Sequence, residues 1–155
     1  MIKIVSGGQT GVDRGALDAA LECGVEAGGW CPEARKAEDG VIPARYPLIE
    51  LEGSGYRQRT KRNVIDSDGT LIIYFGYLTG GTEQTVLFCM KENKPYLLVD
   101  ASELTEKRAA ERLKDFISQQ HISELNVAGP RASSEPEAHE YTKLVISQVL
   151  QLWSR

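Results

Sequence analysis

The sequence predicts an α/β protein of three-layer, Rossmann-like type, in which helices cover both faces of a doubly wound parallel sheet. Short apolar segments alternate along the chain with segments whose apolar residues recur at helical spacing. Glycine-rich stretches follow two of the apolar segments, as expected where a strand turns sharply into a helix. The 155 residues, 41% of them hydrophobic, suit a single domain over residues 1–155.

The first third of the chain is expected to hold two strands, one helix and a long irregular segment. Residues 2–5 form the first strand, and a helix follows over 13–23, where apolar residues share one face until Gly24 ends it. Residues 25–30 form a weak second strand, because two glycines interrupt it. Residues 32–55 are rich in proline, glycine and charge, and loops of that length are usually functional or mobile, which raises the question of a lid.

The rest of the chain continues the alternation. Its clearest strand is Thr70–Phe75, a continuous run of β-favouring residues. The other expected strands are 96–100 and 125–128, and the expected helices are 56–66, 82–92, 105–120 and 136–153. This alternation implies parallel strands joined by right-handed crossovers. We expect about five strands in the order 2-1-3-4-5, with a ligand crevice above strands one and three.

The first glycine loop lies between the first strand and its helix and is a candidate ligand site. Glycines let a backbone approach a ligand closely, the helix N-terminus attracts anions, and a guanidinium suits phosphate. The alternative is a simple tight turn, with Asp13 as a helix cap. The loop lacks the spacing of both GxGxxG and Walker A motifs. A valine at Gly8 is expected to block the ligand while leaving the fold intact. The candidate residues are Ser6, Gly7, Gly8, Gln9, Thr10, Gly11, Asp13 and Arg14.

Two further loops are expected at the same edge of the sheet. Gly80, Gly81, Thr82 and Glu83 follow the clearest strand and are candidate ligand contacts, and the alternative is that Thr82 is a plain helix N-cap. The last strand is followed by Gly129 and Arg131, where a nearby serine could simply cap the last helix.

A basic segment over residues 56–63 could supply positive charge to an anionic ligand. Arg59, Thr60 and Asn63 are the candidates, and the alternative is a solvated helix face. Trp30 could stack on a flat ring or be buried, and Cys31 could bind a soft metal or be a small core residue.

Composition excludes several classes of protein. The formal net charge of −4 argues against general affinity for nucleic acid, and no apolar run approaches the length that crosses a bilayer. Three cysteines without a CxxC motif indicate reduced thiols and a cytoplasmic protein. Two distant histidines do not suggest a metal held by the protein, and no catalytic triad can be assembled.

Motifs spread over most of the chain resemble the molybdenum cofactor carrier protein-like family. The residues that carry the resemblance are 6–15, Trp30-Cys31-Pro32-Glu33, Ala37-Glu38-Asp39-Gly40, Arg59-Thr60, Asn63-Val64 and Gly80-Gly81-Thr82-Glu83. That family is similar to a wider nucleotide-ligand-binding group, which includes lysine-decarboxylase-like phosphoribohydrolases and the DNA-processing protein DprA. The resemblance implies a Rossmann-like fold, a homo-oligomer (a dimer or tetramer), and molybdenum cofactor bound as cargo, with molybdoenzymes or cofactor-synthesis proteins as partners.

The leading hypothesis is therefore a binding protein, not an enzyme, for an anionic pterin or nucleotide-like ligand. The alternative is a hydrolase of nucleotides or nucleoside phosphates with Glu83 as acid/base, although the loop departs from the PGGxGTxxE pattern of the phosphoribohydrolases. A nucleotide-sensing module is a third reading.

Overall fold

The structure, a computed structural model, describes residues 2–153, which alternate strands and helices as the sequence predicts. The helices are α1 (Val12–Glu22), α2 (Tyr56–Asp66), α3 (Gly80–Lys91), α4 (Glu106–Gln120), α5 (Ala138–Trp153) and the short η1 (Glu33–Arg35). The strands are β1 (Lys3–Val5), β2 (Ala27–Gly28), β3 (Trp30–Pro32), β4 (Lys36–Ala37), β5 (Gly40–Val41), β6 (Ile49–Leu51), β7 (Gly69–Tyr74), β8 (Tyr96–Asp100) and β9 (Glu124–Ala128).

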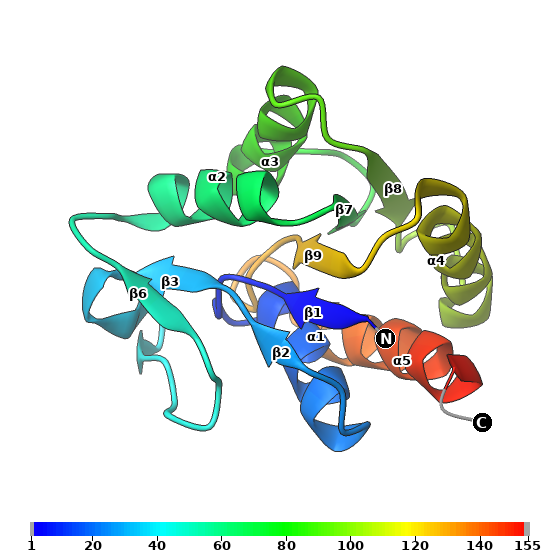
Figure 1. Cartoon of the computed structure of the whole chain (residues 1–155), viewed down its shortest axis with the longest axis horizontal. Coiled ribbons are helices and arrows are strands. Elements are labelled where there is room, and N and C mark those ends of the chain that lie inside the picture. The colour runs from blue at the N-terminus through cyan, green and yellow to red at the C-terminus, as the bar shows by residue number, and fades with distance from the viewer. Residues whose placement is uncertain (1, 154–155) are drawn as a thin grey trace.

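The main sheet is parallel and has five strands, which confirms the predicted fold class, but the predicted strand order was wrong. The observed order is β2-β1-β9-β7-β8, so the last strand lies between the first and the third of the predicted strands. Residues Leu125 to Ala128 of β9 are all buried, as expected for a central strand. Strand β9 is held there because α5, which follows it, packs between α1 and α4 on one face of the sheet (Figure 1).

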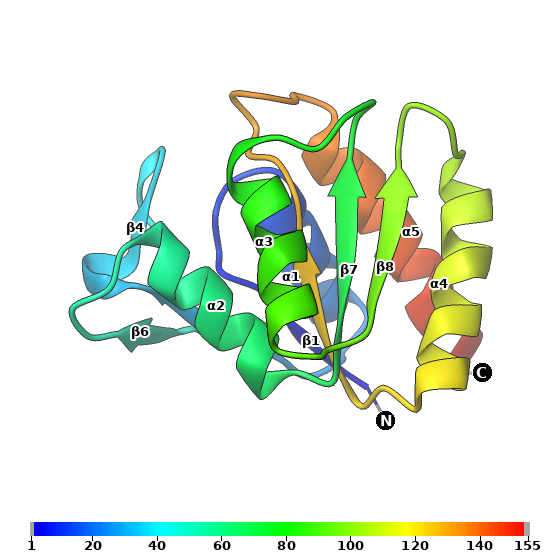
Figure 2. The same cartoon turned by 90° about the horizontal axis from the view of Figure 1, so that it is seen from above.

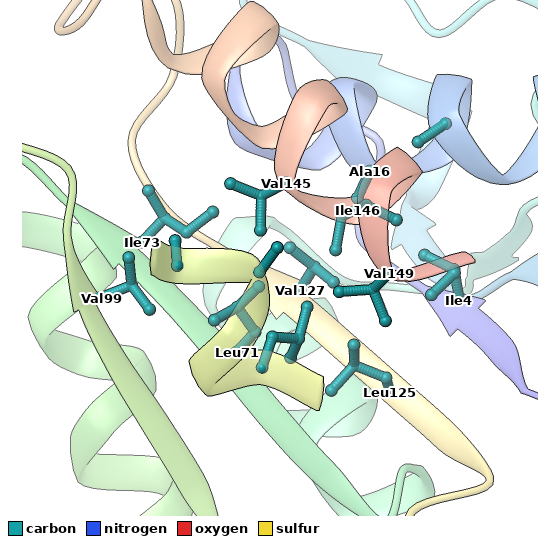
Figure 3. Packing of buried hydrophobic residues seen from close by; sticks show 14 of the residues in the cluster. Ile4, Ala16, Leu71, Ile73, Val99, Leu125, Val127, Val145, Ile146 and Val149 are labelled. Atoms are coloured by element: carbon teal, nitrogen blue, oxygen red, sulfur yellow. The ribbon is translucent and has the colours of Figure 1, made fainter. Parts of the chain in front are cut away.

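The two faces of the sheet are covered by different helices. Helices α1, α4 and α5 cover one face, and α2 and α3 cover the other, as Figure 2 shows. Alternate strand residues point to opposite faces, so Leu71 and Ile73 of β7 belong to the core beneath α5, whereas Ile72 packs with α2 and α3. The larger core brings side chains of β1, β7, β8 and β9 against α1 and α5 (Figure 3).

Helix α3 begins two residues earlier than predicted. Its N-cap is Thr79, whose side chain makes no capping hydrogen bond, so the alternative in which Thr82 is the N-cap was wrong. Thr82 instead lies inside the first turn and is buried. The first amides of α3 therefore have no side-chain acceptor from the cap residue.

The segment after β2 is ordered, although its sequence suggests a loop. Strand β3 leaves the main sheet and pairs in parallel with β6, while β4 and β5 form a small antiparallel hairpin. The guanidinium of Arg35 fastens the segment by donating to the backbone oxygens of Ile42, Pro43, Tyr46 and Leu48 at 2.8–3.2 Å. Charged donors can satisfy carbonyls where no sheet does. Within residues 2–153, no helix combines the length and the apolar character that a membrane span needs.

Candidate functional site

A cavity of about 880 Å³ opens at the carboxyl ends of the parallel strands. The loops after β1, β9 and β7 and the first turns of α2 form its walls. The chain changes from one face of the sheet to the other between β9 and β7, because the helices that follow these strands cover opposite faces. Ligands of doubly wound sheets bind at such a reversal.

The structure brings together candidates from all four predicted segments. Those that line the cavity are Gln9, Asp13, Arg59, Thr60, Gly80, Gly81, Thr82, Gly129 and Arg131. The loop after β9 occupies the centre, since β9 separates β1 from β7. The predicted strand order required the two main glycine loops to be immediate neighbours. They are not, but they still face one cavity.

The glycines of the first loop make room for the protein itself rather than for the cavity. A Cβ on Gly7 would lie 1.9 Å from Nη1 of Arg59, and one on Gly8, whose φ is +80°, would lie 2.5 Å from Cδ1 of Leu48. A Cβ on Gly11 would lie 2.4 Å from the backbone oxygen of Pro130. None of the three lines the cavity. The expectation that a valine at Gly8 spares the fold was wrong, because the space is already filled by apolar side chains.

Polar groups of the same loop fasten it to neighbouring segments. Ser6 is buried, and its hydroxyl donates to the backbone oxygen of Asp13 at 3.0 Å. The hydroxyl of Thr10 donates to the carboxylate of Glu38 and accepts from the backbone N–H of Ala132. Ser6 and Thr10 are thus placed outside the cavity, in contacts that hold the loops in position.

Arg14 also points away from the cavity. Its guanidinium makes a bidentate pair with Asp39 at 2.6 and 2.8 Å, and its Nε donates to the backbone oxygen of Gly8. The Arg14 guanidinium holds the pKa of Asp39 below its usual value. The predicted phosphate contact is therefore replaced by an ion pair that fixes the β4–β5 hairpin to α1.

The second glycine loop differs from the first, because its glycines face open space. No heavy atom lies within 4 Å of a Cβ built on Gly80 or Gly81. Both residues line the cavity at the start of α3. Free amides at a helix N-terminus, together with the helix dipole, favour an anion such as phosphate.

Arg59 is a buried charged group in the wall of the cavity. Its side chain is 11% exposed, and Nη1 lies 3.3 Å from Oδ2 of Asp13. Within residues 2–153 its guanidinium donates no hydrogen bond, and its Nε is buried without a partner. Arg35, in contrast, donates four. A guanidinium that is buried without hydrogen bonds is costly and suits a missing acceptor.

Asp13 places a buried carboxylate in the wall of the same cavity. Burial raises the pKa of Asp13, while Arg59 and the hydrogen bond from the backbone N–H of Gln9 oppose that rise. Gln9 is 6% exposed. Its Oε1 accepts from the backbone N–H groups of Thr10 and Glu38, whereas its Nε2 is buried without a partner. The first loop and the start of α1 therefore contribute Gln9 and Asp13 to the cavity, but none of the three glycines.

Two more of the predicted residues, Asn63 and Glu83, lie outside the cavity. Asn63 is 1% exposed and exchanges hydrogen bonds with the backbone N–H and oxygen of Trp30. It fixes β3 against α2. Glu83 is exposed on α3 and does not line the cavity. Cys31 is fully buried, and residues 2–153 hold no group of three or more His, Cys, Asp or Glu side chains that could bind a metal ion.

The cavity also has aromatic walls that the sequence analysis missed. Tyr56, Tyr74, Phe75 and Tyr77 line it, and the Arg131 guanidinium lies 5.2 Å from the centre of the Tyr56 ring. Flat apolar surfaces beside cationic groups suit a ring that carries a phosphate. A signal was available, since Tyr74 and Phe75 end the clearest strand and Tyr56 begins the basic helix.

The fold and the position of the cavity define a Rossmann-like α/β protein. The chain belongs to the circularly permutated YpsA SLOG family, whose profile matches residues 4–150, and SLOG proteins are a Rossmann-like nucleotide-binding group. It is also similar to a solved structure named "Putative molybdenum carrier protein" from Syntrophus aciditrophicus SB. The two are 43% identical, the match covers 97% of this chain and 94% of the other, and the TM-score is 0.93. None of the curated proteins compared with the chain matches it.

The permutation in the family's description accounts for the unexpected strand order. If counting begins at β7, the five strands of the main sheet run β7, β8, β9, β1, β2, and the observed order becomes 2-1-3-4-5 read from the β8 edge. Ile2 and Trp153 line the same groove, so the two ends of the described chain lie close together. Because the two ends of the chain are neighbours, they can be joined and the chain can begin at another position without a change in the fold.

Proposed function

We propose that the protein binds an anionic, phosphate-bearing ligand of the pterin or nucleotide type in the cavity above β9 and β7. One observation carries the proposal. The start of α3 has no side-chain cap, and its Gly80 and Gly81 are open to the cavity. The same cavity is lined by Arg59, whose guanidinium lacks hydrogen bonds. Both features are left unsatisfied by the protein: the free amides favour the phosphate, and the buried guanidinium lacks a hydrogen-bond acceptor, which the rest of the ligand can supply.

Molybdenum cofactor is the most concrete form of this ligand, and it would be bound as cargo. The proposal rests on the resemblance and on the name of the similar solved structure. The chemistry of the cavity fits, because the cofactor combines a phosphate with a flat pterin ring. The helix N-terminus suits the phosphate, and the tyrosines suit the ring. The metal would arrive with its pterin, so this role does not require a protein ligand cluster.

The position of Glu83 does not favour the hydrolase alternative. An acid/base must reach the reacting atoms, and Glu83 is exposed outside the cavity. The carboxylates that line the cavity are Asp13 and Glu135. The exposed position of Glu83 therefore favours binding over hydrolysis by that residue.

Native mass spectrometry of freshly purified protein tests the proposal, together with calorimetric titration of phosphate-bearing compounds. We expect a retained small molecule that contains phosphorus, and binding of nucleoside monophosphates to protein stripped of it. Arg59→Gln should weaken that binding about tenfold or more, the cost of losing a charged hydrogen bond. Arg62→Gln is the matched control, since Arg62 lies one turn further along α2, is 44% exposed and pairs with Asp66.

Gly81→Val probes the other half of the site. The added side chain meets no protein atom within 4 Å of its Cβ, so the unfolding temperature should not fall. The valine fills the cavity beside the amides of α3, so phosphate binding should be lost. Unchanged affinity in both Arg59→Gln and Gly81→Val would contradict the proposed function.

A further inference from the structure

The end of the cavity near β1 is chemically different from the end near α3. It holds the side chains of Asp13, Arg59 and Gln9. Asp13 neutralises the charge of Arg59, and a second anion there would be repelled by the Asp13 carboxylate. This end of the cavity is therefore suited to a neutral polar group, whereas the α3 end is suited to an anion.

The three side chains leave a defined set of hydrogen-bonding groups unused. Within residues 2–153, Oδ2 of Asp13 accepts from the backbone N–H of Gln9 at 3.1 Å and lies 3.3 Å from Nη1 of Arg59. An ionised carboxylate accepts at two oxygens. Nε of Arg59 and Nε2 of Gln9 are buried hydrogen-bond donors without partners. A buried network that is only partly bonded is costly until its remaining partners are supplied.

We infer that this end of the cavity recognises the 2-amino-4-oxopyrimidine edge that guanine and pterin rings share. The inference rests on the proposed function and names the ring of its ligand. That edge offers two adjacent N–H donors, which match the two oxygens of Asp13, beside a carbonyl acceptor, which matches a donor of Arg59 or Gln9. Adenine lacks the adjacent pair of donors and the carbonyl.

The size of the cavity allows one ligand to reach both ends. Strand β9 alone separates β1 from β7, and two strand spacings amount to about 10 Å. A phosphate joined through a sugar or side chain to a ring can span that distance. The tyrosines that line the cavity offer flat surfaces to the ring.

Ligand-side changes test this inference without altering the protein. Calorimetric titrations of the full chain with guanosine, inosine, xanthosine and adenosine monophosphates compare edges while keeping sugar and phosphate constant. We expect guanosine monophosphate to bind at least roughly tenfold more tightly than the inosine and adenosine compounds, because each loses a charged hydrogen bond. Xanthosine monophosphate should bind most weakly, since its 2-oxo group faces the carboxylate. A phosphorylated 6-substituted pterin distinguishes the sources: tighter binding than guanosine monophosphate identifies a pterin, and weaker binding a guanine nucleotide.

The Asp13→Asn variant should remove the preference for guanosine over inosine monophosphate, because an amide cannot accept at both positions. Asp39→Asn, which removes a carboxylate from its pair with Arg14 of α1 but lies outside the cavity, should retain the preference. Equal affinities for the four nucleotides, or a preference for adenosine monophosphate, would overturn this inference and leave phosphate binding intact. If neither inorganic phosphate nor any of these compounds binds, both this inference and the proposed function are contradicted.

Discussion

The guanidinium of Arg59 lies against the backbone of Gly7, in space that any side chain at position 7 would occupy. A Cβ there would be 1.9 Å from Nη1 and 2.3 Å from Cζ. The glycine loop after β1 and the basic helix α2 are thus linked by one contact. The arrangement holds the guanidinium beside Asp13, in the wall of the cavity.

Gly7→Ala should leave the protein folded but displace Arg59. The obstructing atoms are the far end of a flexible side chain, so the guanidinium can swing away at a cost of about 1 kcal/mol or less in unfolding free energy. Binding of nucleoside monophosphates should then fall as far as it does in Arg59→Gln. Urea denaturation and calorimetric titration measure the two effects. Gly55→Ala is the control, because its Cβ would meet only Oε1 of Gln58, at 3.6 Å. Full binding by Gly7→Ala would show that the position of Arg59 is unimportant.

Gly8→Ala should behave differently, although the two glycines are adjacent. Gly8 has a φ of +80°, and its Cβ would lie 2.5 Å from Leu48 and 2.9 Å from Ile42, which pack in the small core beneath the β4–β5 segment. Backbone strain and overpacking together should lower the unfolding free energy by about 2 kcal/mol or more. Urea denaturation measures the change, and a loss comparable to that in Gly7→Ala would contradict the structural difference between the two positions.

The contrast between the glycines explains why the sequence revealed the site only in part. Glycine density correctly directs attention to the loops after β1 and β7. It does not show whether a missing side chain makes room for a ligand or for the protein. Gly7 and Gly8 make room for Arg59 and Leu48, whereas Gly81 faces open space. That distinction depends on tertiary contacts with α2 and the 30–55 segment, which no local pattern encodes.

The fold was predictable in type but not in strand order, for a similar reason. Periodicity identified every helix longer than three residues and the five strands of the main sheet, because it is a local signal. The position of a strand depends on which helix packs beside which. The sequence of β9 reads as a buried strand and is equally compatible with several positions. Its insertion beside β1 follows from the packing of α5 against α1, and the rule of neighbouring sequential strands fails in a permuted chain.

Arg35→Ala should loosen the segment between β3 and α2. The guanidinium supplies four hydrogen bonds to carbonyls that no strand satisfies. Their loss should lower the unfolding free energy by about 3 kcal/mol, and Arg35→Lys should recover little, since one ammonium cannot reach all four oxygens. Limited proteolysis should cut within residues 36–50 of the variant. Arg45→Ala is the control, because Arg45 donates a single bond, to the Tyr46 hydroxyl. Equal protease resistance of Arg35→Ala and Arg45→Ala would refute the role of Arg35.

Glu38 should make the attachment of the β4–β5 hairpin sensitive to acid. Hydrogen bonds from the hydroxyls of Ser133 and Thr10 lower the pKa of Glu38 below its usual 4.5. A lowered folded-state pKa means that the ionised side chain adds stability above pH 4.5, and that this contribution is lost as the pH falls through the folded value. Glu38→Gln should therefore be less stable than the wild type at neutral pH, and the difference should shrink below pH 4.5. Urea denaturation across the pH range measures it, with Glu33→Gln as a control for the loss of one exposed carboxylate from the same segment. A difference that stays constant from neutral to acid pH would mean that the hairpin does not depend on the charge of Glu38.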